Sequence, residues 1–279
     1  MESSLRNRYS RKTRFNRREV RALAPKLGIK KPSLLFVHMP SATHYYVPIL
    51  AGLFLAEWIA LAIHPLHRHD WILENILLFL VVPILALTYR RFPFSKVSYT
   101  LLFIFGCLHV LGAHYTYSEV PYDSWWDGLT GHSLNDLFDW KRNNFDRFVH
   151  FLYGLLLAYP IREVYLRIAG VRGFWGYALP LSFVMATSMI FELVEWGAAT
   201  IFGGDLGMAY LGTQGDEWDA HKDMALASIG ALIAVVCTAI LNMYLQRDFA
   251  REWADSLRIK HPTPLGEEEL QRLWKQRRK

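Results

Sequence analysis

The stretch DMALASIGALIAVVCTAILNMYL, residues Asp223–Leu245, carries only one charged residue, the aspartate at its start. A bilayer core about 30 Å thick is crossed by roughly 20 apolar helical residues, so this stretch predicts a transmembrane helix. Further apolar blocks of similar length are separated by polar stretches: Tyr45–Ile63, Trp71–Tyr89, Val97–Thr116, Phe148–Ile168 and Phe174–Trp196. We therefore expect an all-α fold, a polytopic membrane bundle of six transmembrane helices.

Polar, basic segments flank this predicted membrane domain. The 279-residue chain begins with a basic arm at residues 1–44 and ends with a basic tail at residues 246–279. Between them, the six-helix domain at 45–245 has two long loops, 117–145 and 197–222, which six crossings place on the same side of the membrane. We expect the arm and the tail to lie at the cytoplasmic surface.

The positive charges predict the orientation. If the N-terminus is inside, the predicted cytoplasmic segments hold 26 of the 31 Lys and Arg residues, and the outer segments hold five. Because Lys and Arg concentrate in cytoplasmic loops, this distribution predicts that both termini are cytoplasmic. It also accounts for the net charge of +6 without a nucleic-acid partner.

Ionisable residues at membrane depth gather on the predicted outer side. Charged groups inside a bilayer are costly and are candidates for function. Eight of the eleven histidines lie on this side: His64, His67, His69, His109, His114, His132, His150 and His221. Most carboxylates at membrane depth lie there too: Glu74, Asp146, Glu192, Glu195, Asp219 and Asp223.

The spacing of these residues predicts that they share helix faces. Residues three or four apart lie on one side of a helix. This spacing occurs in Asp146 and His150, in Glu192 and Glu195, and in Asp216, Asp219 and Asp223. Short motifs of this kind, facing one another at one depth, build the metal sites of helix bundles. We therefore predict an outward-facing polar cavity at this end of the bundle.

Within this cavity, four residues are the predicted metal ligands: His114, Asp146, His150 and Asp223. Mixed imidazole and carboxylate donors suit zinc, manganese or iron, whereas oxygen donors alone suit calcium. The predicted catalytic residues are the carboxylates of Glu192, Glu195 and Asp219. A carboxylate that does not bind the metal can accept a proton from metal-bound water.

Other interpretations of these residues remain open. Aspartates at helix N-termini are favoured by capping and by the helix dipole, so the cluster could be a structural hydrogen-bond network. It could also line a path for a substrate or an ion. In the loop 117–145, the aromatic residues Trp125, Trp126 and Trp140 could anchor the chain at the membrane interface or form a platform for a substrate.

Four motifs resemble the YjdF-type family of bacterial inner-membrane proteins: HVLGAHYTY at 109–117, NFDRFVHF at 144–151, FELVEW at 191–196 and YLGTQGDEWDAHKDM at 210–224. The resemblance covers roughly residues 45–245 and implies a multi-pass location in the inner membrane, while it leaves the mechanism open. DRFVHFLY at 146–153 is similar, more weakly, to a segment of VanZ-like membrane proteins linked to glycopeptide resistance. Their Glu-x-x-Gln motif is replaced here by Glu192-Leu-Val-Glu195.

These patterns favour a metal-dependent membrane hydrolase or transferase that acts on a lipid, lipid-linked or envelope substrate. A transporter or channel for an ion or small solute is the second hypothesis, and a structural or accessory membrane protein is the third. A transporter usually carries polar groups across the whole membrane, but the inner halves of the predicted helices hold few ionisable residues. The expected partners are the lipid bilayer and its lipids.

Overall fold

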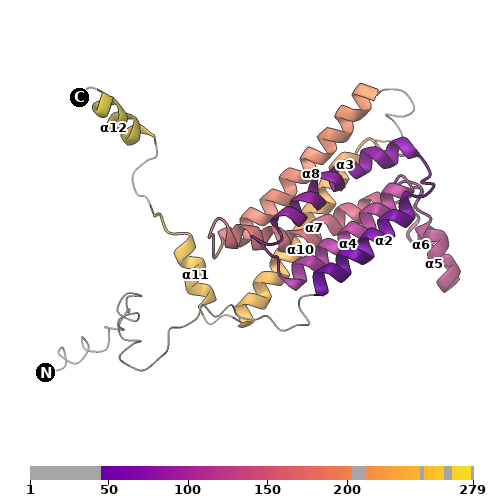
Figure 1. Cartoon of the computed structure of the whole chain (residues 1–279), viewed down its shortest axis with the longest axis horizontal. Helices are drawn as coiled ribbons and strands as arrows, with labels where there is room; N and C mark the ends of the chain where they lie inside the picture. Colours follow the sequence, from indigo (N-terminus) through magenta and orange to yellow (C-terminus); the bar gives the residue numbers. More distant parts are fainter. Residues whose placement is uncertain (1–44, 203–211, 246–247, 261–265, 278–279) are drawn as a thin grey trace. The chain divides into compact units, whose positions relative to one another are not determined.

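The computed structural model describes residues 45–202, 212–245, 248–260 and 266–277, and these residues form helices and connecting segments without a strand. The predicted arm at 1–44 and residues 203–211 of the second predicted outer loop lie outside these ranges. Figure 1 shows the described helices, whose bounds are α2 Tyr46–Ala62, α3 Arg68–Thr88, α4 Lys96–His114, α5 Tyr122–Thr130, α6 Leu134–Phe138, α7 Phe145–Arg167, α8 Trp175–Phe202, α10 Asp219–Leu245, α11 Phe249–Ser256 and α12 Glu267–Arg277. The predicted all-helical class is confirmed.

Among the described residues, four helices are long and apolar enough to cross a membrane: α3, α4, α8 up to Ile201, and α10. Helix α2 is also apolar but has only 17 residues. Helix α7 has 23 residues, but charged side chains lie in its first and last turns. Large apolar side chains on the outsides of the bundle are exposed, among them Leu53, Leu80, Leu193 and Leu241. Exposed apolar surface of this extent is typical of contact with lipid.

The helices follow the predicted apolar blocks closely, and the main differences are at the end of α8 and the start of α10. Helix α8 continues beyond the predicted end at Trp196 to Phe202, and α10 begins at Asp219 instead of Asp223. An aspartate in the first turn interacts favourably with the helix dipole, so Asp219 extends the helix although it is not apolar. Because α10 begins at Asp219, Asp216 precedes the helix and is not part of its stripe.

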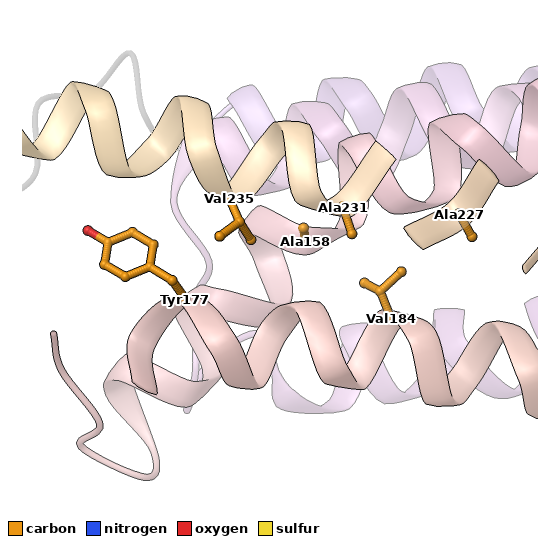
Figure 2. Packing of buried hydrophobic residues seen from close by; sticks show 6 residues of the cluster. All are labelled: Ala158, Tyr177, Val184, Ala227, Ala231 and Val235. Carbon is orange, nitrogen blue, oxygen red and sulfur yellow. The ribbon is translucent and has the colours of Figure 1, made fainter. Parts of the chain in front are cut away.

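The closest packing in the bundle joins α7 to α10. A Cβ atom added to Gly154 of α7 would lie 1.9 Å from the carbonyl oxygen of Ala227, and one added to Gly230 of α10 would lie 2.1 Å from that of Phe151. Small residues let membrane helices approach this closely, and packing then replaces the hydrophobic effect as the main attraction. Figure 2 shows the small side chains Ala158, Ala227 and Ala231 in this core, with side chains of α8 reaching toward them.

At the end of the bundle where α7 finishes and α4 begins, one acidic side chain of α7 binds the start of α4. Glu163 accepts hydrogen bonds from the backbone N–H of Ser95 at 3.0 Å and from the hydroxyl of Ser98 at 2.6 Å. Arg167, one turn away on α7, pairs with Glu163 at 2.6 Å. The carboxylate therefore satisfies a free N–H at the positive end of the α4 dipole, as a capping residue would.

Candidate functional site

The tight contact of α7 with α10 brings the predicted polar residues of both helices together at one end of the bundle. Asp146 and His150 lie in the first two turns of α7, and Asp219 and Asp223 lie in the first two turns of α10. Both pairs are one turn apart and therefore share a face of their helix. Glu192 projects from the adjoining helix α8 and contacts His150. The sequence predicted these shared faces.

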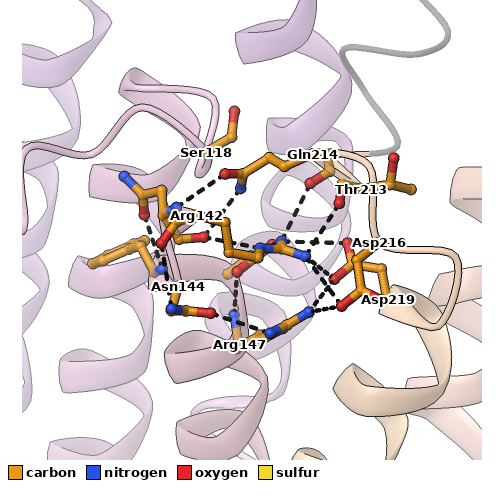
Figure 3. A network of polar contacts seen from close by, with 12 residues as sticks. Ser118, Arg142, Asn144, Arg147, Thr213, Gln214, Asp216 and Asp219 are labelled. Carbon is orange, nitrogen blue, oxygen red and sulfur yellow. Dashed lines mark hydrogen bonds and ion pairs between the residues drawn. The ribbon is translucent and has the colours of Figure 1, made fainter. Parts of the chain in front are cut away.

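Two arginines bridge the starts of α7 and α10 (Figure 3). Arg142, just before α7, pairs with Asp219 and, at 2.5 Å, with Asp146. Arg147, in the first turn of α7, pairs with Asp216 and, at 3.1 Å, with Asp219. These are charge-assisted contacts of mostly buried groups, which are stronger than neutral hydrogen bonds. The guanidinium groups therefore already neutralise much of the charge of Asp146 and Asp219.

Asp216 links this network of ion pairs to the exposed residue Lys222. Its Oδ2 atom accepts from the Lys222 ammonium at 2.5 Å, and its Oδ1 atom accepts from the backbone N–H of Trp218 at 3.0 Å. Lys222 first, and then this N–H and Arg147, hold the pKa of Asp216 well below its usual range. The segment before α10 is fixed further by Arg142, which donates to the carbonyl oxygen of Thr213 at 3.2 Å.

Below the arginines lies a triad of possible metal ligands formed by His150, Glu192 and Asp223. One donor atom from each lies within 4.8 Å of the others, and the Nε2 atom of His150 is 3.6 Å from the Oε1 atom of Glu192. Zinc–ligand distances are about 2.0–2.2 Å, so two ligands on opposite sides of one ion are at most about 4.4 Å apart. Small side-chain shifts are therefore enough to close this triad on an ion.

The carboxylates of this triad are buried without satisfying all their oxygens. The side chain of Glu192 is 8% exposed and Asp223 is 4% exposed. Among the described residues, Oε1 of Glu192 and Oδ1 of Asp223 have no hydrogen-bond partner. Burying a carboxylate oxygen without a partner is expensive, because the oxygen loses its hydration. The donor set and these free lone pairs fit a divalent cation.

A second triad shares Asp223 and consists of Asp146, Asp219 and Asp223. Its oxygens also lie within 4.8 Å of one another. However, Asp146 and Asp219 already bind Arg142, and Asp219 also binds Arg147. The two triads therefore differ in chemistry, since an ion at the second one would have to displace guanidinium groups. His150, Glu192 and Asp223 form the better candidate metal centre.

Three further carboxyl groups belong to neighbouring positions of α8 and α3. Glu195 lies one turn from Glu192 on α8, and it interacts electrostatically with Glu192 and with Glu74 of α3. Glu74 and Asp70 are one turn apart on α3 and buried, and each has one oxygen without a hydrogen-bond partner in the part of the chain that the structure describes. The carboxyl groups of α3 therefore lie near those of α8.

Two histidines of α4 occupy other positions. His114, a predicted metal ligand, lies apart from both triads, because its Nδ1 atom is 2.7 Å from the carbonyl oxygen of Leu61. It thus ties the end of α4 to the end of α2. His109 is buried between the carbonyl oxygen of Glu74, 3.1 Å from its Nε2, and the hydroxyl of Tyr117, 2.5 Å from its Nδ1.

The pairing of these two arginines with the aspartates was not predicted from the sequence. Arg142 and Arg147 are two of the five basic residues in the predicted outer segments. The signal available was the coincidence of these rare outer arginines with the acidic motif at 216–223. Because positive charges are scarce on this side, those that remain there are candidates for specific pairing.

Comparison with known proteins gives the family of the chain. The family described as "Predicted membrane protein (DUF2238)" matches residues 46–244. The chain belongs to this family. The match spans all the helices from α2 to α10, so the DUF2238 region and the membrane domain coincide almost residue for residue.

One curated relative of this chain is the inner membrane protein YjdF of Escherichia coli (strain K12). The two are 36% identical over 185 residues, which covers 65% of this chain and 84% of YjdF. The predicted resemblance to YjdF-type proteins is therefore confirmed, and so is the membrane class. No solved structure matches this chain.

Proposed function

We propose that this protein binds one divalent metal ion through His150, Glu192 and Asp223 and uses it as a membrane hydrolase or transferase. The substrate class is a lipid, a lipid-linked molecule or another envelope component. The observation that supports the proposal is the buried triad, in which an imidazole and two carboxylates with free oxygens lie within 4.8 Å of one another. Mixed nitrogen and oxygen donors of this kind favour zinc, manganese or iron over calcium.

The charges around the triad support a divalent ion. Glu192, Glu195 and three aspartates bring carboxyl groups to this part of the bundle, whereas among the described residues two arginines are paired with them. The aspartates are Asp146, Asp219 and Asp223, and the arginines are Arg142 and Arg147. Carboxyl groups therefore outnumber guanidinium groups five to two, and a divalent cation would stabilise such a buried excess of carboxylates.

In this proposal each residue has a defined task. His150, Glu192 and Asp223 would hold the ion, and Glu195, one turn from Glu192 on α8, would serve as the proton acceptor. The ion would supply Lewis-acid activation of a water molecule at neutral pH. Asp219, predicted as catalytic, would orient Arg142 and Arg147 beside the triad.

Metal analysis of purified protein tests this proposal. We expect one equivalent of metal after expression with zinc, manganese and iron, and a higher melting temperature when that metal is added. A ligand at 100 times its dissociation constant adds about 2.7 kcal/mol to the free energy of unfolding. His150→Ala, Glu192→Gln and Asp223→Asn should each lose the metal, and His132→Ala, in an exposed outer loop, should keep it. Wild-type protein without stoichiometric metal and without a thermal shift would refute the proposal.

A cation transporter is the second candidate, and the acidic residues of α3 favour it. Glu74 and Asp70 extend the buried carboxylates away from the triad, and each has an oxygen without a hydrogen-bond partner within the described ranges. Buried ionisable residues of membrane helices often mark a pathway for an ion. Metal uptake into proteoliposomes separates the two candidates, because transport requires uptake that Glu74→Gln abolishes, whereas an enzyme binds metal without moving it.

For the topology, we propose six spans in a bacterial inner membrane with both termini in the cytoplasm and the triad facing outward. Helices α2 and α7 then add to the four long apolar helices. The support is the strong bias of Lys and Arg toward the predicted inner segments, together with the inner membrane location in the name of YjdF. Labelling of single cysteines with a membrane-impermeant reagent should reach residue 132 from outside and residue 258 only from inside. Labelling of residue 258 in intact cells would contradict this topology.

A further inference from the structure

The chain between α4 and α7 folds into two short helices, and the longer one is amphipathic. In α5, Tyr122, Trp125, Trp126 and Leu129 stand at positions i, i+3, i+4 and i+7, which lie on one face. Asp123, Asp127 and Ser124 lie on other faces of the same helix. The side chain of Leu129 is 84% exposed, and both tryptophans are exposed. The apolar face is thus exposed at Trp126 and Leu129, whereas Tyr122 is partly buried and packs against the bundle.

Helix α6 and the residues just after it also expose large apolar side chains. In α6 and just after it, Leu137, Phe138 and Trp140 are exposed, and Leu137 is 68% exposed. The rings of Phe138 and Trp140 stack with their centroids 4.8 Å apart. A soluble surface rarely gathers so many large apolar side chains in so few residues, and such a patch marks an interaction surface.

Polar contacts between the two helices fix this pair, which we call the α5–α6 hairpin (residues 122–140). Asp123 accepts from the Ser133 hydroxyl at 2.9 Å and from the backbone N–H of Asn135 at 3.0 Å. The Asn135 N–H contributes most to holding the pKa of Asp123 below its usual value. The hydroxyl of Tyr122 donates to the side-chain oxygen of Asn135 at 3.0 Å. The outward orientation of the apolar residues is therefore built into the hairpin.

The hairpin is also attached to the ends of α4 and α7. The backbone N–H of Asn144 donates to the hydroxyl of Tyr122 at 3.1 Å, directly before α7 begins at Phe145. The ring of Trp125 contacts that of Tyr115, next to the end of α4. Helix α4 is long and apolar enough to cross a membrane, and α7 is a span in the proposed topology, so these attachments place the hairpin at the level where both helices leave the bilayer.

We propose that the α5–α6 hairpin lies in the outer leaflet of the membrane, with its apolar face inserted among the phospholipids. An amphipathic helix with tryptophan and leucine on one face lies in the plane of the interface, and tryptophan prefers the headgroup level. The spanning helices also expose large apolar side chains, so one bilayer would cover both regions. Four aspartates and one lysine in the segment 122–141 favour zwitterionic lipid over an anionic surface. Insertion is independent of the proposed enzyme activity, and only its assignment to the outer leaflet depends on the proposed topology.

Spin labels report this insertion directly. We would replace Cys107 and Cys237, attach one nitroxide at residue 129 or 137, and use residues 127 and 136 as matched positions on the polar faces of the same helices. In proteoliposomes of phosphatidylethanolamine and phosphatidylglycerol, labels at 129 and 137 should be more accessible to oxygen than to a water-soluble nickel complex. Labels at 127 and 136 should show the opposite order.

Two results would overturn the proposal. Free access of the nickel complex to all four positions would show a water-exposed hairpin, and spin–spin broadening at 129 and 137 would show that a second copy covers the face. Unlabelled protein gives a second measurement, because lipids brominated near the headgroup should quench the tryptophan fluorescence. Trp125→Phe/Trp126→Phe should lower the quenched fraction, and an unchanged fraction would also contradict insertion.

Discussion

Arg142 and Asp219 are 77 residues apart in the sequence and form an ion pair that joins the segment before α7 to the first residue of α10. The same guanidinium group reaches Asp146, so one arginine fixes the starts of both helices above the candidate metal centre. Both aspartates are mostly buried, and neither could keep its charge there without a cation nearby.

Replacing this arginine tests the bridge. Arg142→Ala leaves Asp146 and Asp219 without their shared partner, and breaking a buried ion pair in this way costs roughly 3–5 kcal/mol. We expect a clearly lower melting temperature in detergent. Manganese should restore part of the loss, because Asp146, Asp219 and Asp223 then offer three free oxygens to an ion. Lys141→Ala, at the exposed neighbouring residue, is the control and should change stability by no more than about 0.5 kcal/mol.

The crossing of α7 with α10 predicts a strong effect of one methyl group. Gly154→Ala places a Cβ atom against the backbone of Ala227, and neither backbone can move without separating the helices. Overpacking of this kind typically costs about 1–3 kcal/mol, and a clash with backbone lies at or above the upper end. Gly197→Ala, on α8, meets no atom within 4 Å and provides the matched control. Equal melting temperatures of the two variants would show that the helices are not packed this closely.

Acid should weaken the exposed side of the network through Asp216. Its pKa in the folded protein lies below the ordinary value of 3.8, so its contribution to stability is complete above pH 3.8 and is lost as the pH falls below it. Melting temperatures measured from pH 6 downward should therefore decrease more steeply below about pH 4 for the wild type than for Asp216→Asn. Asp127→Asn, at an exposed residue of α5, should follow the wild-type curve. A wild-type slope for Asp216→Asn would contradict the assignment.

Much of the fold follows from local sequence, because the length and polarity of a membrane helix are properties of one continuous segment. The six predicted blocks coincide with helices for this reason. Helices α5 and α6 were not predicted, because an amphipathic helix of nine residues is hidden among polar neighbours. Its apolar face becomes visible only when the backbone is known to be helical.

The candidate site was partly predictable for a related reason. Spacing along one helix showed that Asp146 shares a face with His150, but it gave no information about which faces of different helices meet. His114 was grouped with them from its place on the predicted outer side, and in the structure its Nδ1 atom lies 2.7 Å from the carbonyl oxygen of Leu61 in α2. Arg142 lies in a connecting segment, where position depends on distant contacts with residues 213–219 and cannot be inferred from periodicity.

The glycine contact between α7 and α10 also determines how the candidate metal centre can change its shape. His150 and Asp223 belong to two helices that interlock backbone to backbone, so these two ligands move together as one rigid body. Glu192 belongs to α8, which meets this pair through side chains such as Val184 and Tyr177. Tilting or rotation of α8 would therefore move Glu192 relative to His150 and Asp223, and this is the motion that would change the spacing of the proposed ligands.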